Sequence, residues 1–508
     1  MLWPAVVWAA AAAVWLRYAL GATFLYDDWA YVANATFHLG ETQSYRPGFS
    51  VVTGAMTSLF GTHQLRYYLA VDLIAATVPA ALYVALRRLR VGTVTALIAA
   101  ALMVVMPRSD SLHLWWTASP IAVALTLGLL GVAAGGRFVD GGRRAMAWLA
   151  ASLGLVAAAV LTYESTAVLI LLGPALIAFS VRRRRTLVLS ALHVAVVIPA
   201  AWLMYTRTNP GNVANGTPAG QWPSRLGSLL VDAWRIFFTD LPGQIGVAGL
   251  VSGLLVAAAA AAAAVLLGRR VDQGTGARQR IVTSAVSAAL LLAAGFAAFV
   301  PFIPANGYYA PSAPGVGNRV NAAAAIFFAS AAALVAGRLV ELGAERRRGA
   351  APLLAAAGAG LAATLLAVGT RESLADATEF SSAARLRDQT LASTQSALQS
   401  APPGSVLLLG DYARYRGDQL VPILAESWYT QGAIQIRYHD PSLQAAPVDP
   451  TNLCTATGIA LAPGGTPVPY PRVHVIDVGR AAAVPIGDQA SCRSLLPQQV
   501  AVFIDARL

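Results

Sequence analysis

The sequence has little charge and no lysine. Only 12% of its 508 residues are charged, whereas 57% are hydrophobic. A soluble domain carries about 25% charged residues, so this composition excludes an ordinary soluble globular protein. All 36 basic residues are arginine, which we attribute to genomic bias toward Arg and Ala codons. Because these arginines lie in short runs between apolar stretches, the net charge of +12 indicates membrane topology and not a nucleic-acid partner.

Cysteine is also scarce. The chain has only Cys454 and Cys492, and both lie in its polar C-terminal part. The sequence holds no metal-ligand cluster of known spacing and no phosphate-binding loop. If the C-terminal part faces an oxidising compartment, these two cysteines are expected to form a disulfide.

Long apolar stretches dominate the first 370 residues. Stretches of about 17–22 apolar residues are long enough to cross the hydrocarbon core. The first of them lacks the basic flank and the cleavage site of a signal peptide, so we interpret it as a retained helix. The sequence predicts eleven membrane spans, near residues 3–24, 67–86, 91–107, 118–136, 145–163, 165–181, 186–204, 246–268, 281–300, 320–338 and 350–369.

The arginines between these stretches predict the orientation of the chain. Five alternate loops hold 18 arginines, and the loops on the other side hold seven. Arg-rich loops are typically cytoplasmic. We therefore expect the N-terminus inside and the C-terminus outside the plasma (inner) membrane. The long loops 25–66, 205–245 and 301–319 would then all lie outside, where function is expected.

The composition becomes polar after about residue 370, which predicts two domains. Residues 1–369 form the transmembrane domain, and residues 370–508 form a small extracytoplasmic α/β domain. In the latter, residues 371–400 and 419–429 are predicted to be helical. Short β-like runs are predicted at 406–409, 433–438, 458–462, 473–478 and 500–504.

Two adjacent carboxylates, Asp27 and Asp28, follow the first apolar helix directly. Carboxylates at the mouth of a membrane helix are costly to desolvate. One of them can act as a general base with a tuned pKa, while the other orients it or binds a cation. The alternative is that both cap a short amphipathic helix in the loop.

The segments around these carboxylates resemble a known family. Residues 27–29, 45–76 and 101–120 are similar to the GT-C superfamily of membrane glycosyltransferases, and most similar to its protein O-mannosyltransferase-like branch and bacterial relatives. The resemblance covers roughly residues 1–200. It implies that Asp27 or Asp28 is the general base or orients the acceptor. It also implies a polyprenyl-phosphate sugar donor and a reaction at the outer leaflet.

Several polar residues in the predicted outer loops are candidates for substrate binding. Arg46 can pair with a phosphate or act as an interfacial arginine. Arg108 or His113 can meet phosphate, and Trp115 or Trp116 can stack on a sugar, although an aromatic belt would also place tryptophans there. The preferred candidates in this region are Arg46, Arg108, His113 and Trp116.

Three further candidates come from later loops. Glu164 lies at the tip of the hairpin between the fifth and sixth spans, where it can bind a sugar hydroxyl, share a cation or simply contact water. Tyr308 and Arg319 flank a glycine-rich segment before the tenth span. Arg319 begins that helix, whose N-terminal amides favour an anion, so it is the preferred candidate for the donor phosphate. The alternative is a loop with an interfacial arginine.

These observations predict a multi-pass glycosyltransferase of the inner membrane. It would move a sugar from a polyprenyl-phosphate donor to a glycan, lipid or protein acceptor of the cell envelope, by an inverting displacement assisted by aspartate. No cofactor is assigned, and a divalent cation stays an open alternative. Two other functions also stay open: a transporter or flippase of lipid-linked sugars, and a non-catalytic protein of envelope assembly.

Overall fold

The computed structural model describes residues 2–40, 46–106, 108–178, 183–207, 216–240, 275–305, 309–312, 316–345, 351–417, 421–450, 452–461, 465–498 and 502–505.

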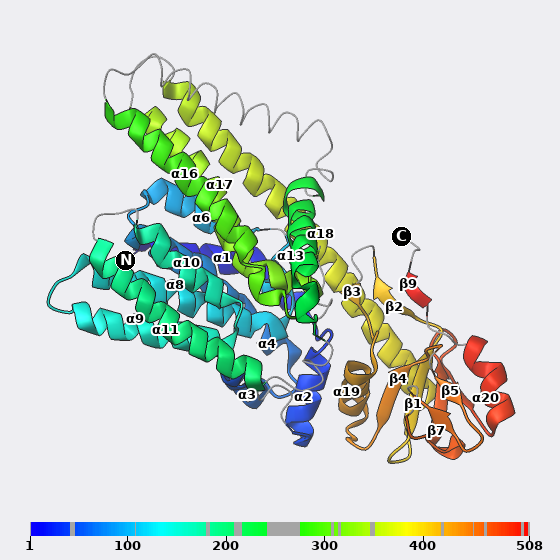
Figure 1. Cartoon of the computed structure of the whole chain (residues 1–508). Helices are drawn as coiled ribbons and strands as arrows, with labels where there is room; N and C mark the ends of the chain where they lie inside the picture. The colour runs from blue at the N-terminus through cyan, green and yellow to red at the C-terminus, as the bar shows by residue number, and fades with distance from the viewer. Residues whose placement is uncertain are drawn as a thin grey trace.

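Most of the predicted membrane spans are helices in the structure (Figure 1). Eight described segments are long and apolar enough to cross a membrane, namely Leu2–Gly21, Gln64–Arg88, Trp116–Asp140, Ala145–Thr162, Arg184–Met204, Ser284–Phe302, Asn318–Gly343 and Leu353–Ala397. Two shorter apolar helices, α6 (Thr93–Val104) and α10 (Thr166–Ala178), lie at two further predicted spans. The remaining prediction, 246–268, lies outside the described residues. The protein is therefore a polytopic α-helical membrane protein.

The long helices pack as a bundle. Its core pairs are α8 with α9 and α5, and α17 with α16, α18 and α6. On α1, apolar side chains such as Trp3, Val6 and Leu20 are exposed, as expected of a helix that faces lipid. The bounds of the long helices are α1 Leu2–Gly21, α4 Gln64–Ala75, α5 Thr77–Arg88, α8 Ser119–Asp140, α9 Ala145–Thr162, α11 Arg183–Arg207, α16 Thr275–Ala297, α17 Ala322–Glu345 and α18 Ala351–Ala397.

Short helices fill the segments between the spans. Helix α3 begins at Pro47, where proline suits the first turn because its missing N–H would be unpaired there anyway. Their bounds are α2 Asp28–Phe37, α3 Pro47–Phe60, α7 Ser111–Leu114, η1 Trp116–Ala118, η2 Ala219–Gln221, α13 Trp222–Trp234, η3 Arg235–Asp240, η4 Val300–Phe302 and η5 Val316–Asn321.

The boundary expected at residue 369 falls inside one helix. Helix α18 runs without a break from Ala351 to Ala397, through the position where the composition changes from apolar to polar. The sequence predicts a span and a separate polar helix here. Since the helix holds no proline after Pro352 in its first turn, its backbone hydrogen bonds continue through the change in composition. As Figure 1 shows, α18 leads from the bundle into the C-terminal domain.

The C-terminal domain is a small α/β unit. Its main sheet has the order β4-β1-β7-β8, in which β1 (Val406–Gly410) is parallel to both β4 and β7. The apolar strands β1 and β7 supply its buried core. The other elements are β2 Ala413–Arg416, β3 Val421–Pro422, α19 Ser427–Tyr438, β4 Gln444–Pro447, β5 Leu453–Cys454, β6 Ile459–Ala460, η6 Tyr470–Arg472, β7 Val473–Asp477, β8 Ala482–Pro485, α20 Gln489–Leu495, η7 Leu496–Gln498 and β9 Val502–Asp505.

Two predictions in this domain are wrong. The segment 433–438 is the second half of helix α19, not a strand. The helix predicted at 419–429 starts only at Ser427, and Val421–Pro422 is strand β3. Alternating apolar residues at 433–438 match a strand, but Tyr429, Ala433 and Ile434 are buried at helical spacing. The strands predicted at 406–409, 458–462, 473–478 and 500–504 overlap β1, β6, β7 and β9.

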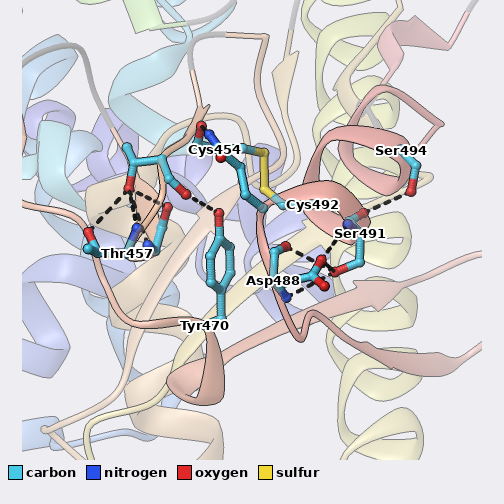
Figure 2. The surroundings of a disulfide bond; sticks show 10 residues. Cys454, Thr457, Tyr470, Asp488, Ser491, Cys492 and Ser494 are labelled. Atoms are coloured by element: carbon cyan, nitrogen blue, oxygen red, sulfur yellow. Dashed lines mark hydrogen bonds between the residues drawn. A yellow bond between two sulfur atoms is a disulfide. The ribbon is translucent and has the colours of Figure 1, made fainter.

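The predicted disulfide is confirmed. Cys454 and Cys492 are bonded, with 6.0 Å between their α-carbons. Figure 2 shows the bond joining the loop around β5 to α20, beside the capping box that Asp488 and Ser491 form at the start of that helix. The Tyr470 hydroxyl donates to the Thr455 carbonyl 2.5 Å away, so this end of the domain is fixed by covalent and polar contacts together.

Candidate active site

The turn between α1 and α2 carries both aspartates. Helix α2 begins at Asp28, and Asp27 is its N-cap residue but makes no side-chain cap hydrogen bond. The preceding residue, Tyr26, has a left-handed backbone with φ of 51°, which is strained for an aromatic residue. The short helix of the capping alternative is thus present, but the Asp27 carboxylate does not cap it.

Asp28 holds the turn together from inside. Its side chain is completely buried. Its Oδ2 atom accepts hydrogen bonds from the Leu25 backbone N–H at 2.9 Å and from the Tyr68 hydroxyl at 3.0 Å. Burial raises the pKa of the Asp28 carboxyl well above its usual range, and these two hydrogen bonds oppose the shift. Asp28 therefore ties the turn to α4 and is not accessible to a substrate.

Asp27 is the accessible member of the pair. It is half-buried. Burial raises its pKa to about 6, the nearby Arg319 charge lowers it, and Glu426 of the C-terminal domain raises it slightly. A carboxylate with a pKa near 6 is well suited to accept a proton near neutral pH. The two aspartates therefore differ in burial and hydrogen bonding, a difference that the sequence did not indicate.

Arg319 connects the Asp27 turn to η5. Its guanidinium carbon lies 5.3 Å from the centre of the Trp115 ring and 5.4 Å from that of Tyr309. The Trp115 ring in turn contacts the Tyr26 ring at 5.5 Å. Cation–π contacts of this kind hold an arginine in place. The Arg319 charge acts on Asp27, because it lowers the pKa of that carboxyl.

A second cationic group, Arg46, contacts Tyr163 and Glu164. Its Nε donates to Glu164 Oε2 at 2.9 Å, and its Nη2 donates to the other carboxylate oxygen. Its guanidinium carbon stacks 4.4 Å from the centre of the Tyr163 ring. Burial raises the pKa of the Tyr163 hydroxyl, while the charges of Arg46 and Arg319 both lower it. Two guanidinium groups from distant segments therefore converge on one tyrosine.

Two buried donors in this region are unsatisfied. Neither the Trp115 indole nitrogen nor the Tyr163 hydroxyl has a hydrogen-bond partner among the described residues. Buried polar groups are nearly always hydrogen-bonded in proteins. Both belong to side chains stacked on Arg319 or Arg46, so a bound ligand with oxygen atoms would satisfy them.

The other sequence candidates lie elsewhere. His113 is buried, stacks on Trp15 at 4.5 Å, and its Nδ1 lies 3.9 Å from an Asp72 carboxylate oxygen. Trp116 is completely buried against Tyr67 at 4.7 Å, although its indole nitrogen also lacks a partner among the described residues. His113 and Trp116 thus pack against neighbouring aromatic rings, whereas Trp115 contacts Arg319.

Arg108 and Tyr308 complete the set. Arg108 is buried with φ of 69°, and its carbonyl accepts a hydrogen bond from Asn321 Nδ2 at 2.7 Å. It lies beside Asp110, whose pKa is raised by burial and lowered by the Arg108 charge among other contacts. Arg108 thus supports the start of α17 from within. Tyr308 lies outside the described residues, and its neighbour Tyr309 contacts Arg319.

Within the described ranges, no three His, Cys, Asp or Glu side chains gather in an arrangement suited to a metal ion.

The C-terminal domain contacts the aspartate turn directly. Helix α19 packs so closely on α2 that a β-carbon at Gly432 would lie 2.7 Å from the Trp29 carbonyl oxygen. The Tyr429 ring contacts the Tyr26 ring at 5.7 Å. From α18, the completely buried Arg387 donates to Thr23 Oγ1 at 2.6 Å and lies 5.3 Å from the Trp29 ring centre. Tertiary packing alone brings these residues together, so they were missed in the sequence.

No family model and no curated protein matches the sequence. Among solved structures, the chain is similar to ArnT from Cupriavidus metallidurans bound to undecaprenyl phosphate, with 14% identity, coverage of 87% of this chain and 85% of that one, and a TM-score of 0.42. The apo state of the same ArnT is 14% identical, and the match covers 99% of this chain and 89% of that one with a TM-score of 0.38. The chain is also similar to the archaeal oligosaccharyltransferase AglB from Archaeoglobus fulgidus, in complex with an inhibitory peptide and a dolichol-phosphate. The identity is 12%, the match covers 88% of this chain and 64% of that one, and the TM-score is 0.42. Likenesses at this level carry no weight for function.

Proposed function

We propose that this protein is a GT-C-type glycosyltransferase that uses a polyprenyl-phosphate sugar as donor. The single observation that carries the proposal is the position of Asp27. It is a partly buried carboxylate with a pKa raised to about 6, next to the Arg319 charge. A proton acceptor and an anion-binding cation are the two groups that such a transfer needs.

The reaction follows from these two groups. Asp27 takes the proton of an acceptor hydroxyl, and the resulting oxygen nucleophile attacks the anomeric carbon of the donor sugar. The bond from that carbon to the phosphate oxygen breaks, and its electron pair leaves with polyprenyl phosphate. Because the displacement is direct, the configuration at the anomeric carbon inverts.

The arginines stabilise the leaving phosphate. Arg319 is held by Trp115 and Tyr309, and Arg46 stacks on the Tyr163 ring. The buried Trp115 and Tyr163 donors supply further hydrogen bonds to phosphate or sugar oxygens. Since these groups supply positive charge and donors for the phosphate, we expect transfer to continue in the presence of EDTA.

The acceptor is a hydroxyl of a cell-envelope glycan, lipid or protein at the outer leaflet. The asymmetry of the loop arginines supports this, because it favours an extracytoplasmic position for the aspartate turn and the C-terminal domain. Contacts of α19 and α18 with the turn give the C-terminal domain a position from which it can present an acceptor to Asp27.

The test is sugar transfer in proteoliposomes. Purified protein is incubated with radiolabelled polyprenyl-phosphate sugars and a delipidated or lipid-linked envelope glycan fraction. We expect labelled glycan with an inverted anomeric linkage from the wild type, and roughly 10²–10⁴-fold less of it from Asp27→Asn. A flippase would instead move the intact donor to the other leaflet without cleaving its glycosyl–phosphate bond. Movement of the donor without any cleavage would overturn the proposal in favour of transport.

A further inference from the structure

A cleft opens beside the aspartate turn, between the membrane bundle and the C-terminal domain. Its volume is about 570 Å³, and it lies where α2, α18, α19 and the turn before α4 meet. Trp29, two residues after Asp27, forms part of one wall. Small-molecule sites commonly have this size and often occur between domains.

The lining of this cleft suits carbohydrate. Gln64 and Gln395 contribute amides, Asp388 a carboxylate and Arg437 a guanidinium, while Trp29 and Leu391 add apolar surface. Planar groups with paired donors and acceptors match the neighbouring hydroxyls of a sugar. Aromatic and aliphatic side chains match its C–H faces. An isoprenoid chain, by contrast, would bury these amides and charges without partners.

The charges in the cleft restrict the kind of carbohydrate. Asp388 pairs at 2.7 Å with the completely buried Arg387, so its negative charge is largely compensated. Of the remaining ionisable groups that line the cleft, Arg437 and His439 are both basic. This balance favours a neutral or acidic glycan and disfavours a cationic one.

The cleft is also tied to the turn that carries Asp27. Arg387 donates to Thr23 in that turn and lies over the Trp29 ring. Gln64 Oε1 accepts a hydrogen bond from the Phe24 N–H at 3.0 Å. A ligand in the cleft therefore contacts side chains that are fixed to the backbone on either side of the catalytic candidate.

We propose that this cleft binds the carbohydrate chain of the acceptor, a neutral or acidic oligosaccharide, through sugar residues that do not react. This inference rests on the proposed glycosyltransferase function only in that it takes the bound glycan to be the acceptor. Binding of the glycan needs neither donor nor turnover, so it can be tested separately from sugar transfer.

Cysteine protection in the full-length protein is the direct test. Both native cysteines are in the disulfide, so Gln395→Cys introduces a single reactive thiol in the cleft. Gln399→Cys is the matched control, because Gln399 is exposed and does not line the cleft. Maleimide labelling in nanodiscs is timed with and without defined arabinan, galactan, mannan, glucan and uronic-acid oligosaccharides.

At least one oligosaccharide should slow labelling of Gln395→Cys about threefold at twice its dissociation constant, with no effect on Gln399→Cys. Equal slowing of both thiols, or no slowing of the first by any member of the panel, would overturn the proposal. Protection without sugar transfer would contradict the glycosyltransferase function but support glycan binding in the cleft. Sugar transfer without protection would support the function and contradict glycan binding in the cleft.

A kinetic test uses the exposed residue Arg437. Arg437→Gln should raise the acceptor KM about tenfold and leave kcat and the donor KM unchanged, as expected for lost binding of a non-reacting part of the substrate. Arg437→Lys should recover part of the affinity, since it keeps the charge without the planar fork. A fall in kcat with an unchanged acceptor KM would contradict the assignment.

Discussion

The Arg46 guanidinium holds the Glu164 carboxylate by two hydrogen bonds, although 118 residues separate them in the chain. The pair joins the start of α3 to the tip of the α9–α10 hairpin. The exposed fractions of the two side chains are only 6% and 29%. An ion pair buried to this degree is costly to break from one side, because the remaining charge loses its partner.

We therefore expect Glu164→Leu to lower thermal stability more than the double variant Arg46→Met/Glu164→Leu. A double-mutant cycle should give a coupling energy of about 1–3 kcal/mol. The measurement is thermal unfolding in nanodiscs, with Arg90→Met/Asp140→Leu as the control, because the Arg90–Asp140 pair is exposed and such pairs contribute about 0–1 kcal/mol. If the effects of Arg46→Met and Glu164→Leu on stability simply add in the double variant, the two side chains are not coupled.

The pH dependence of transfer should follow Asp27. A general base works only when it is deprotonated, so kcat/KM should fall as the pH drops below about 6. Arg319→Gln removes the charge that lowers this pKa, and the acidic limb should therefore move to higher pH. Arg144→Gln, an exposed arginine in a predicted cytoplasmic loop, should leave the profile unchanged. If the acidic limb of the kcat/KM profile stays at the same pH in Arg319→Gln, the Asp27 carboxyl does not determine that limb.

Orientation gives a prediction with two independent measurements. If the C-terminus is extracytoplasmic, a reporter enzyme active only in the cytoplasm should be silent when fused after Leu508. Free-thiol labelling of the denatured, unreduced protein from cells should also find no thiol, because Cys454 and Cys492 pair in the structure and disulfides persist in oxidising compartments. An active reporter together with two labelled thiols would show that the C-terminus is cytoplasmic and that the predicted orientation is wrong.

The membrane part of the fold was largely predictable, because lipid imposes a single strong pattern. Apolar length and loop arginines located the spans to within a few residues, as for Ala145–Thr162 against the predicted 145–163. In the C-terminal domain the pattern is weaker. The alternation at 433–438 indicated a strand, whereas the segment is the second half of α19, which packs against α2 at Gly432. Such a contact has no signature in local sequence.

The site was predictable only in part, for the same reason. Position after the first helix indicated the aspartate pair, but only the structure distinguishes the two, since Asp28 is buried and accepts hydrogen bonds from Leu25 and Tyr68. Adjacent tryptophans look alike in sequence. The contact with Arg319 distinguishes Trp115 from Trp116, and that contact spans about two hundred residues of chain.

The two aspartates should respond differently to substitution. Asp27→Asn keeps the shape of the side chain but cannot take a proton, so transfer should fall roughly 10²–10⁴-fold with normal expression and donor binding. Asp28→Ala should instead lower stability, by about 1–3 kcal/mol, because it leaves the buried Leu25 N–H and Tyr68 hydroxyl without their acceptor. Asp28→Asn can still accept both bonds through its amide oxygen and should therefore retain more activity than Asp27→Asn. Transfer and thermal unfolding measured side by side on the three variants separate these roles. If Asp27→Asn turns over at the wild-type rate while Asp28→Asn is inactive and stable, the buried carboxyl is the catalytic one, and the assignment of Asp27 as the base is wrong.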